Sequence, residues 1–366
     1  RNVWWIIDYN RQSLDGVVHE GLSERLSSVF EAFGWNLIVL KYGRLQKDAF
    51  KEPGGDLLKK WIDDCPNQLY SALIYEGGAA FKKRVLDDIG DQDIVSKLIN
   101  KRSDNEFLEL MANLGGHCVP TLCDAFNGIK DDKPTAFIAY TIKGWGTPLA
   151  GHKDNHAGLM TKIQMDSFKS KFGITEGNEW NSFLDAKEDL ELNEFIMNSP
   201  FQKARHRKYN SKKVPVDDII LITETKISTQ NAFGKILDQY AKNDTEFGNR
   251  IITTSPDVSV STNLGPWINK KGLFSRTDSS DTFRDRKIPS AQKWIFSSQG
   301  QHIELGIAEM NLFLMLGAAG LSHELFGERL FPIGTVYDPF IARGLDAMNY
   351  ACYQDARFMI VGTPSG

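Results

Sequence analysis

A short apolar run that becomes polar abruptly constrains this chain more than any other feature. Val3 to Ile7 is almost unbroken in apolar residues, which is typical of a strand buried on both faces of a parallel sheet. Asp8, Asn10 and Gln12 follow at once, and ligands of open α/β sheets bind beyond the carboxyl ends of strands. Amide and carbonyl oxygens there suit Mg²⁺ shared with a phosphate. An ordinary polar strand-to-helix turn explains the same residues.

Size and charge exclude several classes of protein. The 366 residues allow two or three domains, and the formal net charge of -4 gives no basic footprint for nucleic acid. No apolar run reaches membrane-spanning length, and we expect no signal peptide. The four cysteines form no CxxC pair, so we expect reduced thiols in a cytoplasmic protein. Because a strand begins almost at Arg1 and another ends near Gly366, we expect a fragment of a longer protein.

Strands alternate with helices along the chain, which predicts an α/β fold of doubly wound parallel sheets. We expect strands at 35–41, 135–142, 250–254, 329–335 and 358–361. Helices are expected at 23–33, 56–64, 107–114, 119–127, 160–172, 183–197, 229–242 and 339–350. The stretches 75–81 and 264–290 are expected to be irregular, and 82–101 to be a solvated helical insertion. The basic stretch 201–214 is interpreted as a linker, although a nucleic-acid tract has a similar composition.

A glycine-rich loop follows the expected strand at 135–142. Residues 143–158 contain four glycines and a proline, and loops at strand ends carry function more often than packing. Lys143 opens this loop, where its ammonium can reach a phosphate. His152 and His156 lie within it, and either an acid–base role or an ordinary surface position accounts for them.

A second polar position stands out in an apolar helix. From Ile307 the helix is apolar almost all round, so it should be buried, and Glu309 is its exception. A buried carboxylate is unfavourable unless a partner binds it, although a glutamate near a helix start also suits the helix dipole. Asp257 again falls at a strand end. Tyr337 and Phe340 fall at a strand-to-helix turn, where aromatic rings stack on flat heterocycles or simply fill a core.

Taken together, these stretches resemble the thiamine-diphosphate enzymes of the transketolase superfamily. They are most similar to the homodimeric E1 component of the pyruvate dehydrogenase complex. The similarity rests on Asp-Tyr-Asn-Arg-Gln-Ser-Leu-Asp-Gly at 8–16, Thr-Ile-Lys-Gly-Trp-Gly at 141–146, the loop histidine, Ile-Ala-Glu at 307–309 and the aromatic pair. Each motif is weak alone, but all five occur in the family's order along most of the chain.

The resemblance implies a role for each of these residues. Asn10 would bind Mg²⁺ through its side chain and Gln12 through its main-chain carbonyl, while Leu14 packs on thiamine diphosphate. Lys143 would lie near the diphosphate. His156 would handle the substrate in a mobile loop that closes over the site and excludes water. Glu309 would contact the aminopyrimidine and act in catalysis. The remaining cofactor-binding residues would be Asp257, Tyr337 and Phe340.

The resemblance also implies a reaction and an organisation. The reaction is decarboxylation of a 2-oxo acid, pyruvate foremost, with acyl transfer to a lipoyl-bearing E2 acyltransferase. Residues 1–165 would belong to the diphosphate-binding domain, 166–222 to a helical linker and 223–366 to the pyrimidine-binding domain. A homodimer is implied, with Asn10 and Glu309 of one chain serving different active sites. A transketolase-type transfer of two carbons between sugar phosphates, or a non-catalytic relative, remains the alternative.

Several departures from the family pattern bear on these expectations. The Gly-Asp-Gly half of the cofactor motif, with its acidic metal ligand, and the family's third domain are not within the 366 residues. Asp8 replaces a more usual asparagine, and Val258 stands where the pyruvate enzyme has a second acid. The last two differences leave the identity of the 2-oxo acid open.

Overall fold

A computed structural model describes residues 3–13, 16–180, 190–205, 209–218 and 220–364. The chain divides into two compact units, Arg1–Leu184 and Asp185–Gly366. Each unit contains one sheet, with strand order β1-β3-β2 in the first and β6-β5-β7-β4-β8-β9 in the second. Every strand pair within these sheets is parallel, which confirms the predicted α/β class with parallel sheets.

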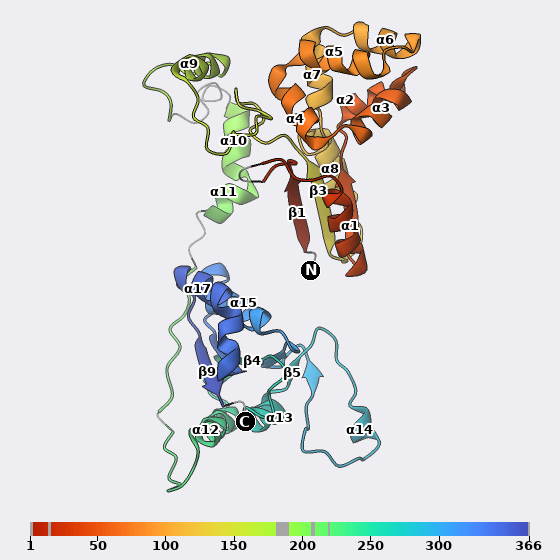
Figure 1. The fold of residues 1–366 in the computed structure, drawn as a ribbon. Helices are drawn as coiled ribbons and strands as arrows, with labels where there is room; N and C mark the ends of the chain where they lie inside the picture. Colours follow the sequence, from red (N-terminus) through yellow and green to blue (C-terminus); the bar gives the residue numbers. More distant parts are fainter. Residues whose placement is uncertain (1–2, 14–15, 181–189, 206–208, 219, 365–366) are drawn as a thin grey trace. The chain divides into compact units, whose positions relative to one another are not determined.

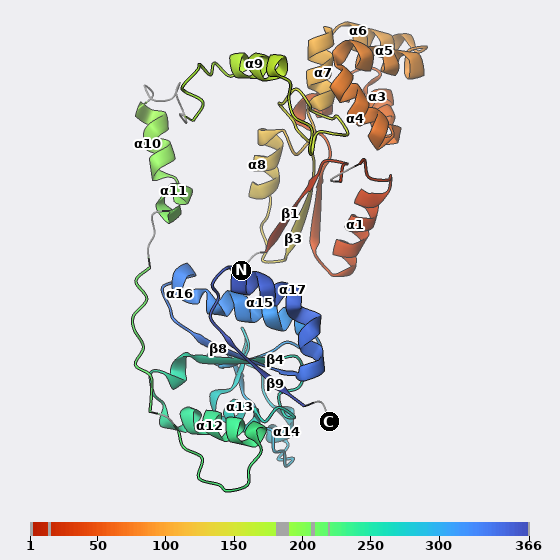
Figure 2. The same ribbon diagram turned by 60° about the vertical axis from the view of Figure 1, so that its left-hand side comes forward.

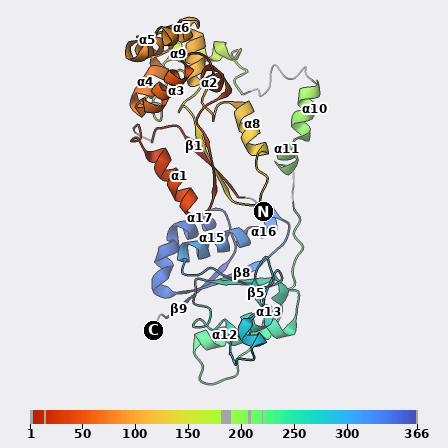
Figure 3. The same cartoon turned by 90° about the vertical axis from the view of Figure 1, so that its right-hand side faces the viewer.

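The first unit is built around β3, whose six residues are all buried. Helix α8 packs on one face of the sheet through Leu122, Ala125 and Phe126, and α1 lies on the other face (Figures 2 and 3). The elements are β1 (Trp4–Tyr9), α1 (Leu22–Ala32), β2 (Asn36–Leu40), α2 (Arg44–Ala49), α3 (Gly55–Asp64), α4 (Asn67–Glu76), α5 (Gly78–Ile89), α6 (Asp93–Asn100), α7 (Asp104–Ala112), α8 (Val119–Asn127), β3 (Thr135–Tyr140) and α9 (Lys162–Lys171).

Helices α2 to α7 form a layer beyond the carboxyl ends of these strands (Figure 1). Two predictions for this region are wrong. Residues 75–81 are helical on both sides of a single break at Gly77, whose φ of 96° suits glycine. The stretch 82–101 is no solvated insertion, because Val85, Val95 and Ile99 are fully buried. Its many charged side chains occupy the outer face of amphipathic helices and obscure the apolar face.

Strand β1 also differs from the expectation of burial on both faces. Trp5 is 57% exposed, and Val3, Trp4 and Ile6 are exposed as well. The strand lies at the edge of the sheet, where it pairs with β3 on one side only. Trp5 packs edge-to-face against Phe30 and Trp35, so aromatic contacts cover part of this edge.

The second unit has helices on both faces of its sheet. Helices α15 and α17 lie side by side on one face, and α12 and α13 on the other (Figure 2). The elements are α10 (Leu190–Asn198), α11 (Pro200–Arg205), α12 (Thr229–Asn243), η2 (Gly248–Arg250), β4 (Ile251–Ser255), α13 (Gly265–Lys271), β5 (Leu273–Phe274), α14 (Thr282–Asp285), β6 (Phe296–Ser297), β7 (His302–Glu304), α15 (Glu309–Gly320), α16 (Ser322–Leu325), β8 (Phe331–Tyr337), η3 (Asp338–Gly344), α17 (Leu345–Tyr353) and β9 (Met359–Thr363).

Two expectations for the second unit need correction. The stretch 264–290 contains α13, whose Trp267 and Ile268 are fully buried beside Leu237 of α12. Helix α15 begins at Glu309, not Ile307, and only one face is buried, through Leu312, Phe313 and Leu316. The part of the expected helix at 183–197 that precedes residue 190 lies outside the described residues. In the described ranges, no helix combines the length and apolarity needed to cross a bilayer.

Candidate functional site

The predicted metal-binding residues lie in a tight turn directly after β1. The side-chain oxygen of Asn10 accepts a hydrogen bond from the backbone N–H of Gln12 at 3.0 Å. Between them Arg11 adopts a left-handed conformation with φ of 64°, and its carbonyl accepts from the Val18 N–H at 2.9 Å. These bonds fix the turn at the carboxyl end of the strand. Leu14, the predicted cofactor contact in this turn, lies outside the described residues.

Lys143 comes from a distant part of the chain to the same turn. Its ammonium donates to the Ser13 carbonyl at 2.7 Å, and the Gln12 side-chain amide donates to the Gly151 carbonyl at 3.1 Å. Asn10, Gln12 and Lys143 line one cavity of about 10 Å³ together with Gly151. The structure therefore brings the three predicted residues of the diphosphate end together.

Arg11 is a residue of this turn that sequence reasoning missed. It is buried, and its guanidinium lies over the Tyr70 ring at 4.2 Å and farther from the Tyr140 ring, at 5.4 Å. Stacking of a desolvated guanidinium on tyrosine is favourable and holds the left-handed residue in place. No local pattern indicates this role, because Tyr70 and Tyr140 lie far from Arg11 in sequence.

The oxygen atoms at this turn could bind a magnesium ion only if an anion bound with it. Asn10 and Gln12 supply neutral oxygens, and the Gln12 side-chain oxygen is buried without a hydrogen-bond partner among the described residues. Among all the residues that the structure describes, no group of three or more His, Cys, Asp or Glu side chains is placed to hold a metal ion. Mg²⁺ commonly takes one or two protein ligands and completes its shell with phosphate oxygens and water. The turn, with the cations Arg11 and Lys143 beside it, suits a magnesium–diphosphate pair.

The glycine-rich loop at 143–158 is folded back on itself. The Asn155 side-chain amide donates to the carbonyls of Lys143 at 2.9 Å and Leu149 at 3.4 Å. The His152 ring packs against Tyr75 at 4.6 Å between centroids, whereas His156 is exposed on the loop. The structure thus places the predicted histidine on the loop without bringing it to the Asn10 turn.

His117 is a second group that the sequence did not single out. Its Nε2 accepts from the Ile142 N–H at 2.8 Å, and its ring stacks on Trp145 at 4.4 Å. Burial lowers the pKa of His117, and the nearby Asp8 carboxylate only partly offsets this. Both rings line a cleft of about 780 Å³ beside the loop. The Gly-Gly-His run at 115–117 was the available signal.

Because Asn155 donates to carbonyls at the start and in the middle of the loop, Asn155→Ala should loosen the loop. Loss of two hydrogen bonds should raise amide exchange across 143–158 and lower the local free energy of opening by about 1–2 kcal/mol. Hydrogen exchange read by mass spectrometry measures this, and Asn100→Ala, at an exposed position of the same unit, is the matched control. Equal exchange in the two variants would show that Asn155 does not hold the loop.

Glu309 begins α15 and is 8% exposed, so its carboxylate is buried as expected. Its partner is Arg343, whose Nη1 donates to Oε1 at 2.8 Å. The same guanidinium stacks over the Phe340 ring at 3.7 Å from the centroid. The Tyr337 ring is 6.1 Å from Phe340, and its hydroxyl donates to Ser261 Oγ at 2.7 Å. Arg343, which was not predicted from the sequence, therefore contacts both Glu309 and Phe340, and Tyr337 lies next to Phe340.

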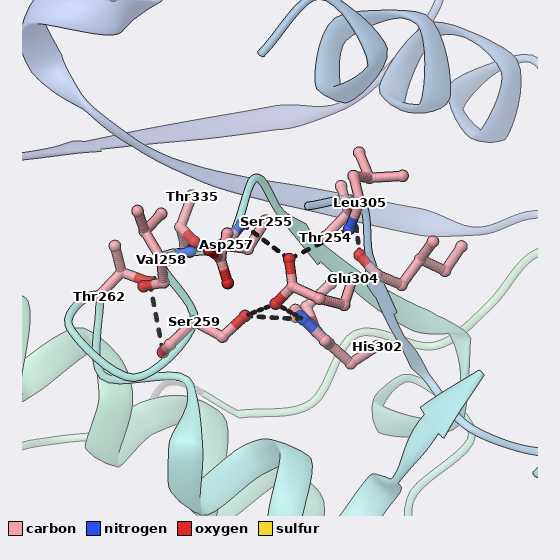
Figure 4. A network of polar contacts seen from close by, with 12 residues as sticks. Thr254, Ser255, Asp257, Val258, Ser259, Thr262, His302, Glu304, Leu305 and Thr335 are labelled. Carbon is pink, nitrogen blue, oxygen red and sulfur yellow. Dashed lines mark hydrogen bonds and ion pairs between the residues drawn. The ribbon is translucent and has the colours of Figure 1, made fainter. Parts of the chain in front are cut away.

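Asp257 belongs to a separate network at the ends of β4 and β7 (Figure 4). Its backbone N–H donates to Glu304 Oε1 at 2.7 Å, and the residue has a φ of 63°. The Ser259 hydroxyl donates to Glu304 Oε2 at 2.6 Å and lies 2.9 Å from His302 Nε2. Since the Ser259 proton is directed at Glu304, its oxygen accepts from the His302 ring.

The Glu304 carboxylate is held in its charged form. Burial alone would raise the pKa of Glu304, but the nearby His302 ring, 3.6 Å from Oε2, and hydrogen bonds from Ser259 and the Asp257 amide outweigh it and lower the pKa to about 2. The same Oε1 accepts from the Leu305 N–H at 3.1 Å, in the loop that leads to Glu309. Glu304 thus fixes the turn that carries Asp257. None of its network partners resembles a recognisable motif in the sequence.

Comparison with known proteins gives curated relatives along the whole chain, although no family model matches it. The chain is 26% identical over 385 residues to the pyruvate dehydrogenase E1 component of Pseudomonas aeruginosa, covering 99% of this chain and 42% of that protein. For the Escherichia coli E1 component the identity is 23% over 396 residues, covering 100% of this chain and 43% of that protein. The chain spans about two-fifths of the length of these relatives.

Solved structures give the fold. A transketolase from Leishmania mexicana matches with a TM-score of 0.50 at 17% identity, over 98% of this chain and 42% of that one. A transketolase mutant from Pichia stipitis matches with a TM-score of 0.51 at 13% identity, over 99% and 42%. The chain is a homologue of E1 components with the transketolase-superfamily fold. The resemblance inferred from its motifs is therefore confirmed, and in this E1 homologue the Asn10 turn and the Glu309 group occupy different units.

Proposed function

We propose that this E1 homologue takes part in thiamine-diphosphate-dependent oxidative decarboxylation of a 2-oxo acid, with pyruvate as the foremost substrate. The acyl group would pass to the lipoyl group of an E2 acyltransferase. One observation carries the proposal: Asn10, Gln12 and Lys143, which are distant in sequence, converge on one cavity at a strand end. The homology to E1 components supports the reaction class.

The first unit would hold the diphosphate. Asn10 and the Gln12 carbonyl would bind Mg²⁺, and Lys143, whose ammonium contacts the same turn, would neutralise phosphate charge. The His117 ring contacts the start of the Lys143 loop, by stacking on Trp145 and by accepting from the Ile142 N–H. We assign 1–165 to a diphosphate-binding domain, 166–222 to a linker and 223–366 to a pyrimidine-binding domain.

The second unit would hold the aminopyrimidine. The Glu309 carboxyl would bind the ring nitrogen, Tyr337 and Phe340 would contact the ring, and Asp257 would complete the pocket at the end of β4. When bound, thiamine diphosphate supplies a nucleophilic ring carbon and an electron sink for decarboxylation. His156 would then move a proton at the substrate once its loop closes and excludes water.

The two half-sites would meet between the chains of a homodimer. Asn10 of one protomer and Glu309 of its partner would serve the same coenzyme. The setting would be cytoplasmic, and the four cysteines are free thiols, as such a setting requires. Assays of 2-oxo acid decarboxylation against ketose cleavage separate this reaction from the transketolase-type alternative.

Calorimetry with thiamine diphosphate and Mg²⁺ tests the proposal. We expect saturable binding that weakens by at least roughly tenfold in Asn10→Ala, because a metal ligand and the hydrogen bond that shapes the turn are both lost. Asn100→Ala serves as the matched amide control and should bind as the unaltered protein does. No heat of binding in the unaltered protein would favour a non-catalytic relative and refute the proposal.

A further inference from the structure

Arg343 contacts both Glu309 and Phe340, and these two contacts resemble those that a planar heterocyclic ligand would make. Its guanidinium donates to the buried Glu309 carboxylate at 2.8 Å and stacks on Phe340 with Cζ at 3.7 Å from the ring centroid. A planar group with N–H donors, bound by a carboxylate at its edge and an aromatic ring on its face, is the shape of an aminopyrimidine. The carboxylate and the ring are the residues to which the proposed function assigns that heterocycle.

We propose that Arg343 occupies the position that the aminopyrimidine would take and must leave it when the coenzyme binds. The inference rests on the proposed function, since it takes Glu309 and Phe340 as the pyrimidine site. It adds a competitor within the protein, so coenzyme affinity is set partly by how firmly Arg343 holds the pocket.

The burial of the Glu309 carboxylate explains why it needs a partner such as Arg343. Glu309 has only a tenth of its side chain exposed, and a buried carboxylate without a partner is strongly unfavourable. Arg343 supplies that partner through its hydrogen bond to Oε1. Phe340 packs against the core formed by Leu312, Phe313 and Val336, which leaves Arg343 to cover the ring from outside.

Arg343 is also able to leave. Its side chain is 52% exposed, so a change of rotamer returns the guanidinium to water at little cost. It sits on the η3 segment (Asp338–Gly344), while Glu309 lies on α15 and Phe340 shares η3, so neither the helix nor the pocket wall has to move. The ligand class follows from these contacts: a planar heterocycle with a ring nitrogen and an exocyclic amine.

The direction in which one substitution changes the affinity for the coenzyme separates this role of Arg343 from its alternatives. If Arg343 competes with the ring, Arg343→Met should tighten binding of thiamine diphosphate, because the competitor is gone and Glu309 gains from a new partner. We expect a decrease in Kd on the order of tenfold, the size expected when a binding-competent state becomes dominant. If Arg343 instead contacts the coenzyme or merely positions Glu309, the same change should weaken binding.

The experiment is calorimetric titration of thiamine diphosphate with Mg²⁺ into the unaltered protein, Arg343→Met, Arg343→Lys and Arg284→Met. Arg343→Lys keeps the charge without the planar stack and should bind with intermediate affinity, and it remains usable if the methionine variant folds poorly. Arg284→Met, an exposed arginine of the same unit, should change nothing. Equal or weaker binding by both Arg343 variants would overturn this inference alone. Absence of binding in all four proteins would overturn the proposed function and this inference with it.

Discussion

Glu309→Ala is expected to reduce coenzyme-dependent decarboxylation by on the order of 10²–10⁴-fold while the fold persists. The carboxyl is the acidic group that α15 presents, buried, beside Phe340, and alanine offers the ring nitrogen no hydrogen bond. The measurement is kcat for a 2-oxo acid at saturating thiamine diphosphate and Mg²⁺, with circular dichroism to verify the fold.

The fold should survive in Glu309→Ala because Arg343, which loses its carboxylate partner, is not buried. Arg343 is about half exposed and can return to water, so no buried charge is left unpaired and the stability lost should be about 1 kcal/mol. Glu324→Ala, with its side chain 65% exposed on α16, is the matched acidic control and should retain full turnover. Full turnover in Glu309→Ala would refute the catalytic role of this carboxyl.

Glu304→Gln should cost the second unit about 3 kcal/mol of stability at neutral pH. Lowering the pKa of Glu304 from 4.5 to about 2 means that the folded state favours its charged form by roughly this amount. The side chain is only 26% exposed, so solvent screening is modest. Glutamine has one acceptor oxygen where the carboxylate uses two, and it leaves either Ser259 or Asp257 without a partner.

The pH dependence follows from the direction of the shift. The folded-state pKa of Glu304 is depressed, so its contribution is fully present above the unfolded value of 4.5 and is lost as the pH falls through about 2. Urea denaturation measures the free energy of unfolding of the unaltered protein and of Glu304→Gln. The difference between these two free energies should be about half as large at pH 3 as at pH 7. A difference that does not change with pH would show that the charge of Glu304 does not stabilise the fold.

The regular elements with clear periodicity were predictable from sequence. Residues 119–127 and 135–140 form the expected helix and strand, and α12 occupies the expected amphipathic stretch. The prediction failed for 82–101 because charged side chains on the surface hide the apolar face of these helices. The prediction of burial failed for β1 because its position at the edge depends on the order of the other strands in the sheet.

The candidate site was predictable only in part. Asn10, Gln12 and Lys143 were found because polar residues at strand ends converge in parallel sheets. Arg343 could not be found this way, because its pairing with Glu309 joins residues 34 positions apart and depends on how η3 packs beside α15. The Glu304 network has the same origin, since β4 and β7 become neighbours only through the sheet order.

If the Asn10 turn of one protomer and Glu309 of its partner bind the same coenzyme, two inactive variants should restore each other's activity in a mixed dimer. Asn10→Ala and Glu309→Ala proteins are each prepared alone, then unfolded and refolded together, and decarboxylation is measured. At a coenzyme concentration below the Kd of the Asn10→Ala protein, we expect strongly reduced turnover for each variant alone and recovered turnover in the mixture, because a mixed dimer has one doubly altered site and one intact site. A mixture as inactive as its two components, with mixed dimers verified, would contradict the account.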